Sequence, residues 1–359
     1  MKIYKIGIIE GDGIGPELIS SAKTVLERAC VGQIQLEFHG EDGGAGTYVR
    51  TGMNLSTEAL ERIKRDYAAT LKGPVGLPEV RKPDGTEGGL LGGTLRVGLD
   101  AYANVRPIRS IPNVRTPMRP SQGPIDYVIV RENTEGLYLS RGLGVGNDRA
   151  CSDQLLMTRG GIERIVHFAF KLARKRGGAP KDHVRRVTCV DKSNVLRTYA
   201  FFRQIFDEIA PLYPDVEADH RYADAAGHDI VFDPGHFDVL VMENFLGDIL
   251  SDVGAATVGG LGMCPSGNIG DASAYFEPIH GSAPAIAHKN LANPISQILS
   301  AAMLLNHIGE TRLGDRIEAA VALAFERRVI DILETGSPKG GTTAVTKAIS
   351  QIVEGVMES

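Results

Sequence analysis

Residues Ile3–Glu17 have the sequence IYKIGIIEGDGIGPE, in which an apolar run leads directly into a glycine-rich turn and a proline. The apolar run is typical of a buried strand, and Pro16 suits the first turn of a helix predicted over Pro16–Cys30. The glycines are spaced GxGxG, so the GxGxxG fingerprint of the Rossmann fold is not met. The segment therefore predicts a tight strand-to-helix turn that needs no bound pyrophosphate.

The same succession of strand and helix patterns continues along the chain. Apolar runs predict further buried strands at Ile125–Val130, Arg186–Val190 and Phe237–Met242. Helical periodicity predicts helices at Gly161–Arg176, Ser193–Ala210, Pro294–Ile308 and Gly314–Glu334. Thr158 can cap the first of these helices, and Gly177-Gly178 can end it. The alternation indicates an α/β fold.

Length and composition exclude several classes of protein. With 359 residues, of which 43% are hydrophobic and 23% charged, the chain can form two lobes around sizeable cores. A net charge of -5 gives no general basic surface for nucleic acid or an anionic membrane. No apolar run approaches the length that a membrane span requires. The four cysteines are scattered without CxxC spacing, so we expect neither disulfides nor a zinc site, and a cytoplasmic protein.

The stretch Glu243–Asp252, ENFLGDILSD, places two carboxylates four residues apart near the start of a predicted helix. At this spacing Asp248 and Asp252 share one helix face, and two such oxygen donors can hold Mg²⁺ or Mn²⁺. Acids in a first helical turn are also stabilised by the helix dipole, so spacing alone favours a purely structural role. The opposite side of the helix is expected to be buried through its apolar residues, Leu246, Ile249, Leu250 and Val253.

Three arginines stand beside apolar or strand-like stretches. They are Arg96 and Arg106 in LRVGLDAYANVRP, and Arg131 in VIVRENTEGLY. A guanidinium group matches a carboxylate with two parallel hydrogen bonds. Taken singly, each is more often a structural or surface arginine. Together with the two aspartates, they describe a pocket for a substrate that bears several carboxylates.

Tyr138 and Lys192 are candidates for proton transfer. Lys192 lies in VDKSNVLR at the end of a predicted buried strand, where desolvation and nearby cations can lower the pKa of its amine. A lysine so placed can act as a base, and a tyrosine can act as an acid. Without other motifs, a half-buried tyrosine and a lysine with its stem on apolar surface would be the simpler interpretation. The loop Glu277–Pro284, EPIHGSAP, adds backbone donors and an imidazole for a flat polar ligand.

The chain resembles the β-decarboxylating dehydrogenases, the family of isocitrate, homoisocitrate, 3-isopropylmalate and tartrate/D-malate dehydrogenases. The resemblance covers nearly the whole chain and rests on motifs in the family's order: GDGIGPE, LDAYANVRP, VRENTEGLY, DKSNVL, NFLGDILSD, GGLGMCPSGNIG and EPIHGSAP. It implies an isopropylmalate/isocitrate dehydrogenase-like α/β fold, not a Rossmann fold. Residues 1–101 and 259–359 would form a large cofactor-binding domain. Residues 102–258 would form an inserted small domain with the dimer interface and the substrate and metal residues.

The resemblance also implies roles for individual residues in a homodimer with shared active sites. Arg96, Arg106 and Arg131 would clamp the carboxylates of a hydroxy di- or tricarboxylate. Asp248, Asp252 and the neighbouring subunit's Asp224 would bind Mg²⁺ or Mn²⁺. Lys192, also donated by the neighbour, would help to remove the hydroxyl proton, and Tyr138 would protonate carbon after CO₂ leaves. The positions for NAD or NADP would be Ile14, Asn194 of the neighbour, Glu277, His280, Gly281, Ser282, Ala283, Pro284, Ile286 and Asn293.

Departures from the family's motifs bear on the dinucleotide. Many NAD-dependent members have Asp directly after HGSAP or HGTAP, where this chain has Ala285. The Lys-Tyr pair of some NADP enzymes is absent as well, since Ile286 follows. The usual DLGG near the C-terminus is replaced by the PKGG of residues 338–341. NAD is favoured, and NADP is the alternative.

Departures before the first arginine bear on the substrate. In the family this stretch, here Gly88–Leu95, reads the substituent on C3. Leu90 and Gly92 replace the Ser and Asn typical of isocitrate enzymes, and isopropylmalate enzymes usually have Leu at the positions of Gly92 and Gly93. ENTEGLY, however, is closer to the isocitrate, homoisocitrate and tartrate branches. Our hypothesis is that the glycines leave space for an unusual or larger substituent on a (2R)-hydroxy acid of the 3-substituted malate type.

The sequence is compatible with three other functions. One is a tartrate/D-malate-type dehydrogenase. Another is a catalytically silent regulatory subunit of a hetero-oligomeric isocitrate dehydrogenase, although such subunits tend to lose the active-site groups that this chain retains. A third is a dehydrogenase that oxidises without releasing CO₂, which would need no site for a β-carboxylate.

Overall fold

Contacts within the chain divide it into two compact units. The computed structural model describes residues 1–83, 85–119 and 122–355. The first unit comprises Met1–Asp100, Ile111–Arg115 and Gly259–Ser359, and the second comprises Ala101–Ser110 and Thr116–Val258. The sequence prediction, with boundaries at 101/102 and 258/259, did not include the short return of the chain at 111–115.

The return has a physical cause in the core of the first unit. Ile111 and Val114 pack against that core. Between them, the Asn113 side chain donates hydrogen bonds to the carbonyl oxygens of Phe325, at 3.2 Å, and Glu326, at 3.1 Å. The segment therefore belongs by packing to the first unit, although it lies within the stretch predicted for the second.

The first unit contains a five-stranded part of a sheet. Its order is β2 (Ile34–Gly40), β1 (Lys2–Ile9), β3 (Ala69–Lys72), β12 (Ala274–Pro278) and β11 (Pro265–Ile269). Neighbouring strands are parallel except for the β11–β12 pair. Strands from both ends of the chain therefore share this sheet, as the resemblance predicted for a discontinuous domain.

Four helices of the first unit pack on one another and on its strands. They are α1 (Gly15–Cys30), α9 (Ile295–His307), α10 (Thr311–Glu326) and α11 (Thr342–Gly355). Their apolar faces and the strands enclose one buried core. The smaller helices of this unit are α2 (Ala45–Thr51), α3 (Thr57–Asp66) and α4 (Gly92–Gly98).

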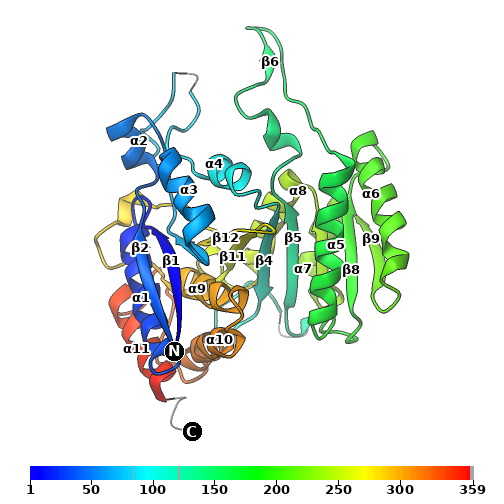
Figure 1. The fold of residues 1–359 in the computed structure, drawn as a ribbon. Coiled ribbons are helices and arrows are strands. Elements are labelled where there is room, and N and C mark those ends of the chain that lie inside the picture. Colours follow the sequence, from blue (N-terminus) through cyan, green and yellow to red (C-terminus); the bar gives the residue numbers. More distant parts are fainter. Residues whose placement is uncertain (84, 120–121, 356–359) are drawn as a thin grey trace. The chain divides into compact units, whose positions relative to one another are not determined.

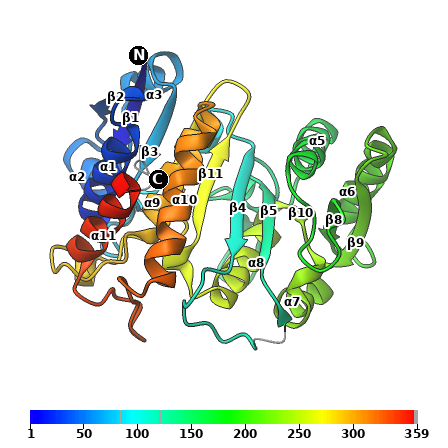
Figure 2. The same ribbon diagram turned by 90° about the horizontal axis from the view of Figure 1, so that it is seen from below.

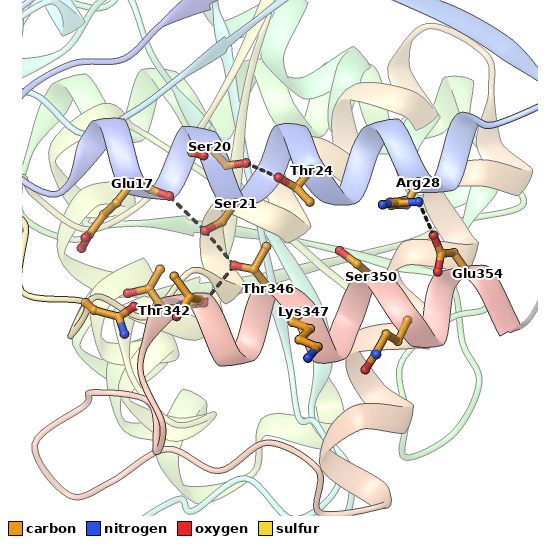
Figure 3. Close-up of a pocket in the computed structure, with 13 residues that line it drawn as sticks. Glu17, Ser20, Ser21, Thr24, Arg28, Thr342, Thr346, Lys347, Ser350 and Glu354 are labelled. Carbon is orange, nitrogen blue, oxygen red and sulfur yellow. Dashed lines mark hydrogen bonds and ion pairs between the residues drawn. The ribbon is translucent and has the colours of Figure 1, made fainter.

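Helices α1 and α11 lie side by side along a polar seam (Figure 3). The Thr346 hydroxyl donates to the Ser21 hydroxyl at 2.8 Å, and Arg28 pairs with Glu354 at 2.7 Å. The hydroxyl-rich groove along this seam has a volume of about 550 Å³. These bonds fix the C-terminal helix against the helix that follows the opening turn.

The second unit contains a five-stranded part of a sheet as well. Its order is β4 (Ala103–Arg109), β5 (Asp126–Glu132), β10 (Val239–Met242), β8 (Arg186–Asp191) and β9 (Glu217–Tyr222), and only β4 and β5 are antiparallel. Helices α5 (Arg159–Lys175) and α6 (Arg197–Ile209) cover one face, and α7 (Ala223–Phe232) and α8 (Asn244–Thr257) cover the other (Figure 2). A small hairpin, β6 (Val145–Gly146) and β7 (Cys151–Ser152), extends away from these layers (Figure 1).

The predicted elements agree with the structure best where their ends are marked by caps. The Thr158 hydroxyl accepts a hydrogen bond from the Gly161 N–H at the start of α5, as predicted. The α/β class is confirmed. None of the helices within the described ranges has both the length and the apolar character needed to cross a membrane.

Two predicted helix ends were wrong. The helix predicted from Ser193 begins at Arg197, because the Ser193 N–H donates to the Asp191 carboxylate and the chain first makes a turn. The helix predicted to extend to Glu334 is α10, which ends at Glu326. There Arg328 has a positive φ of 54°, which breaks the helical path.

Candidate active site

Helix α8 carries the predicted acid pair, but it buries a different face from the one expected. Of the four apolar residues, Leu250 is buried, whereas Ile249 is 48% exposed. The buried face includes small residues, among them Gly247, Ser251 and Gly254. They are small because the neighbouring strands are close: a Cβ at Gly247 would lie 2.6 Å from the side-chain carbons of Arg131. Only glycine lets the helix approach the arginine this closely.

The contact brings Arg131 and Asp248 together. Arg131, at the end of β5, is fully buried, and its Nη1 is hydrogen-bonded to Asp248 Oδ1. Its Nε donates to Asn244 Oδ1 at 2.9 Å. Asp248 and Asn244 are four residues apart and therefore lie on one helix face. The guanidinium is thus held by two side chains of α8 in one fixed orientation.

Arg106, on the neighbouring strand β4, joins the same group. Its Nη2 lies 3.6 Å from Asp248 Oδ1 and its Nη1 lies 3.6 Å from Asp252 Oδ1. Asn104 accepts from its Nε at 2.7 Å, and Ser251 accepts from its Nη1 at 2.6 Å. Two buried guanidinium groups therefore face the two carboxylates.

Tyr138 completes what we call the acid–arginine cluster, namely Arg106, Arg131, Tyr138, Asp248 and Asp252. It lies in a short 3₁₀ helix, Leu137–Ser140, and its hydroxyl donates to Asp248 Oδ2 at 2.7 Å. Burial and this hydrogen bond raise the pKa of Tyr138 above its usual value. The phenol therefore keeps its proton at neutral pH.

The electrostatics of the cluster suit a hard cation. The pKa of the Asp252 carboxyl is raised. Burial is the main cause and nearby Asp248 adds to it, while the charge of Arg106 acts in the opposite direction. Both carboxylates remain partly open to solvent, with side-chain exposures of 37% for Asp248 and 53% for Asp252. Oxygen donors of this kind fit Mg²⁺ or Mn²⁺. Within the described part of one chain, however, no third acid, His or Cys joins them as a metal ligand.

Lys192 and Asp224 are brought together elsewhere in the second unit. Lys192 follows β8, Asp224 lies in the first turn of α7, and Lys192 Nζ is 2.6 Å from Asp224 Oδ1. This pairing lowers the pKa of the Asp224 carboxyl. Asn194 is exposed in the turn after Lys192. Two of the three residues expected to reach a neighbouring subunit, Lys192 and Asp224, are therefore held as one pair.

The first unit contains a pocket of about 350 Å³ that gathers most of the predicted cofactor residues. We call it the loop pocket. Burial lowers the pKa of the His280 imidazole, and its buried Nε2 has no hydrogen-bond partner among the described residues. An unsatisfied buried nitrogen in a pocket fits a polar ligand such as a dinucleotide. The pocket is lined by Ile14, Gly262, His280, Gly281, Ala283, Ile286, Leu291, Ala292, Asn293, Thr335, Gly336 and Ser337.

Other predicted residues support this pocket or lie beside it. Ser282 is buried, and its carbonyl oxygen accepts from the Ile14 N–H at 2.8 Å, which joins the loop to the opening turn. Pro284 and Ile286 bound a short 3₁₀ turn. Glu277 does not line the pocket. Its carboxylate pairs with buried Lys72 and accepts from Asn268 Nδ2 at 2.9 Å.

Arg96 belongs to α4 of the first unit, whereas Arg106 and Arg131 belong to the second. Burial acts to raise the pKa of Glu277, but the charges of Lys72 and Arg96 outweigh it and lower that pKa. An ideal Cβ at Gly92 would lie 3.7 Å from Arg96 Cζ, so a methyl group at this position would touch the guanidinium without a clash.

A sequence model of the isocitrate/isopropylmalate dehydrogenase family matches residues 5–352. The chain belongs to this family. It is a β-decarboxylating dehydrogenase of the isopropylmalate/isocitrate type, as the motifs predicted.

Relatives in the family carry names with different substrates. The chain is 41% identical to a 3-isopropylmalate dehydrogenase of Bifidobacterium longum over 355 residues, which is 97% of this chain and 98% of the relative. It is also 41% identical to an isocitrate/homoisocitrate dehydrogenase of Thermus thermophilus over 352 residues, 97% of this chain and 99% of the relative. The crystal structure of an isocitrate dehydrogenase from Methylococcus capsulatus matches with a TM-score of 0.85 and 38% identity, and the match covers 98% of this chain and 99% of that one.

Sequence analysis of this dehydrogenase missed several site residues. Asn244 and Ser251 hold the arginines, and both lie on the Asp248 face of α8, so helical spacing could have indicated them. Gly262 and the Thr335–Ser337 segment line the loop pocket from distant parts of the chain. No local pattern could have linked these segments to the HGSAP loop.

Proposed function

We propose that the enzyme catalyses metal-dependent oxidative decarboxylation of a (2R)-hydroxy acid of the 3-substituted malate type, with hydride transfer to NAD(P). The acid–arginine cluster carries this proposal. It combines two buried guanidinium groups, a protonated phenol and two adjacent carboxylates on one helix and the strands beside it. A substrate with several carboxylates and a hydroxyl needs all of these groups.

Substrate carboxylates would bind to Arg106 and Arg131, with Arg96 as the third clamp. Both arginines of the second unit are buried and oriented by amide and hydroxyl side chains, so little conformational entropy is lost when a carboxylate arrives. Planar guanidinium groups in fixed positions also select the geometry of a carboxylate.

Asp248 and Asp252, with Asp224 of the partner subunit, would hold Mg²⁺ or Mn²⁺. When bound, such a cation polarises the substrate's hydroxyl or keto oxygen and stabilises negative charge that develops there. Lys192 of the partner subunit would accept the hydroxyl proton while hydride leaves C2 for the nicotinamide. Loss of CO₂ from the resulting β-keto acid leaves a carbanion equivalent, and the Tyr138 hydroxyl would supply its proton.

The loop pocket would bind the dinucleotide. His280 Nε2 offers a hydrogen bond, and the aliphatic side chains of Ile14 and Ile286 offer apolar surface. Among the described residues, those that line the pocket include no acidic side chain that would repel the 2′-phosphate of NADP. NAD remains the favoured cofactor because the Lys-Tyr pair of NADP enzymes is absent, and NADP is the alternative.

A homodimer with shared sites accounts for two further observations. The second unit exposes large apolar side chains on the adjoining helices α7 and α8: Ile249 is 48% exposed, Val231 46% and Phe232 70%. Apolar surface of this kind is typical of subunit interfaces. Pairing two copies through these helices would also supply the third carboxylate that the described residues of one chain do not bring to the acid pair.

A substrate panel tests the reaction. Isocitrate, homoisocitrate, 3-isopropylmalate, tartrate and D-malate are each assayed with NAD and NADP, with and without Mg²⁺ or Mn²⁺. We expect CO₂ release to accompany dinucleotide reduction on a 3-substituted malate. Reduction that survives complete removal of divalent metal would refute the metal dependence. Turnover of D-malate or tartrate alone would identify the other branch of the family.

Mixing two inactive variants tests the shared site. Asp224→Ala and Asp248→Ala are expected to be inactive separately. After the subunits are exchanged, half of the dimers combine both variants, and each of these has one intact site of two. The mixture should therefore regain about a quarter of the wild-type activity. If activity is not regained although mixed dimers are detected by native mass spectrometry, Asp224 acts within its own subunit or not at all.

A further inference from the structure

Glu243 is a buried carboxylate that joins three elements of the second unit. It stands between β10 and α8 and is 1% exposed. Its Oε2 accepts from the Leu246 N–H at 3.3 Å, which caps α8, and from the Tyr199 hydroxyl of α6 at 3.0 Å. Its Oε1 accepts from the Leu137 N–H at 3.1 Å. Leu137 directly precedes Tyr138, so one side chain ties the tyrosine's backbone to the start of α8.

Gly136 is shaped for this contact. Its φ is +83°, and a Cβ at this position would lie 2.1 Å from Glu243 Oε1. A side chain there would therefore push the segment away from the carboxylate. The close approach of the chain before Tyr138 to Glu243 depends on this glycine.

The segment that carries Tyr138 and the helix α8 are also connected directly, through Asp248. Glu243 fixes the backbone beside Tyr138 and caps the helix that carries Asp248, while the Tyr138 hydroxyl donates to Asp248 Oδ2 at 2.7 Å. Asn244 adds a second connection between α8 and the segment before Tyr138, because its Nδ2 donates to the Glu135 carbonyl oxygen at 3.1 Å. The phenol is thus held at both its backbone and its hydroxyl.

We propose that Glu243 is a positioning residue that holds Tyr138 in place as the proton donor. The inference rests on the proposed function, because it assumes that Tyr138 donates a proton during the reaction. Glu243 is 1% exposed and engaged by three donors, so its carboxylate is not accessible to a ligand. Its role is to fix the position of the phenol, so its loss should slow proton delivery without weakening substrate binding.

The sharpest variant is Glu243→Asp, which keeps the charge and remains a good helix cap but is one methylene too short to reach Leu137 as well. We expect kcat to fall about tenfold, KM to change less than about twofold, and the solvent deuterium isotope effect on kcat to rise. Circular dichroism and thermal unfolding should remain close to the wild type. Glu243→Gln, which keeps the length and removes the charge, is the second variant if the first does not fold.

Ser56→Ala is the matched control for a lost cap. The Ser56 hydroxyl caps α3 in the first unit by accepting from the Ala59 N–H at 3.1 Å. Its removal should lower the melting temperature and leave kcat unchanged. An unchanged kcat and isotope effect in both Glu243 variants would overturn the positioning role.

A double-mutant cycle with Tyr138→Phe separates this proposal from the one on which it rests. If Glu243 acts through Tyr138, the double variant should have the kcat of Tyr138→Phe within about twofold. A double variant whose loss equals the product of the two single losses would overturn the positioning role while leaving Tyr138 as the proton donor. A Tyr138→Phe enzyme with undiminished kcat would instead overturn the proton-donor role itself.

Discussion

The acid–arginine cluster and the loop pocket are built by different means. In the cluster, buried charged side chains on strands and a helix pair with one another and with amide and hydroxyl groups. The loop pocket is lined mainly by small, aliphatic or hydroxyl-bearing residues of turns, with His280 as its one ionisable lining side chain among the described residues. The first site is defined by charge and the second by shape and backbone. Substitutions in the cluster should therefore change the chemical step, and substitutions in the pocket should change cofactor binding.

The largest effect is expected for Asp248→Asn in the cluster. The amide can still accept from Arg131, so the fold should persist, but the negative charge that a cation needs is lost. We expect kcat/KM to fall about a thousandfold and Mg²⁺ affinity to weaken at least tenfold. Steady-state kinetics and metal titration measure both.

Asp215→Asn is the matched control for that variant. Asp215 is an exposed acid of the same unit, and its side chain pairs with Arg174. Its replacement should leave turnover and metal affinity unchanged. Undiminished turnover of Asp248→Asn would show that Asp248 is not part of the active site. The contrast between the acid–arginine cluster and the loop pocket would then fail.

Beside the loop pocket, Ala285→Asp should change the choice of dinucleotide and leave the chemical step intact. A carboxylate after the HGSAP motif would repel the 2′-phosphate of NADP and could accept hydrogen bonds from ribose hydroxyls. We expect the KM for NADP to rise at least tenfold, with kcat on NAD within about twofold. Ala285→Asn, of equal size without charge, is the control, and a similar loss with Asn would mean that bulk causes the effect.

Gly92→Leu should show that the first unit also reads the substrate. A side chain at residue 92 would extend next to Arg96, whose guanidinium carbon lies 3.7 Å from the ideal Cβ position. We expect kcat/KM for large 3-substituted malates to fall about tenfold relative to D-malate. Gly92→Ala, which would make only an ordinary contact, should change this ratio little. An unchanged ratio with Leu would place the third-carbon substituent elsewhere.

The smallest effect concerns the stability of the charge-rich second unit at low pH. Burial acts to raise the pKa of Asp219, but hydrogen bonds from His236 and the His220 N–H and the charge of Arg221 lower it from 3.8 to about 2. Because the folded pKa lies below the unfolded one, the stabilisation is complete above the unfolded value and is lost as the pH falls toward 2.

Asp219→Asn should therefore lower the free energy of unfolding by about 1 to 2 kcal/mol at pH 7 and by less at pH 3. Urea unfolding at both pH values measures the difference. Asp207→Asn, in an exposed acid paired with His220, should cost less at pH 7. A cost for Asp219→Asn that does not change with pH would show that packing, not charge, accounts for it.

Sequence reasoning succeeded where a local pattern has a local cause. The Thr158 cap and the proline after the opening turn predicted helix starts because caps act within one turn. It did not predict β11 (PSGNI) or β12 (AYFEP), because neither segment is a continuous apolar run. β12 pairs with nearby β11 but also with β3, a distant partner that leaves no local signal in the sequence.

The candidate site shows the same division. Motif order identified Arg131, Tyr138 and Asp248, and the structure brings these three into contact. The exposed position of Ile249 could not be predicted, because an apolar residue at helical spacing looks the same whether a core or another subunit covers it. Lining residues such as Thr335 are equally invisible, since a pocket is a property of the folded chain.

The short return of the chain at 111–115 limits where crossovers can be placed in chimeras of this enzyme with its relatives. A recombinant exchange of the whole inserted stretch between relatives would carry Ile111 and Val114 with it, although their packing partners are encoded in the flanking segments. In such a chimera, residues 111–115 would come from one parent and the core against which they pack would come from the other. Crossovers placed on either side of the five residues, leaving them with the host sequence, should give folded hybrids more often than crossovers at the outer boundaries alone.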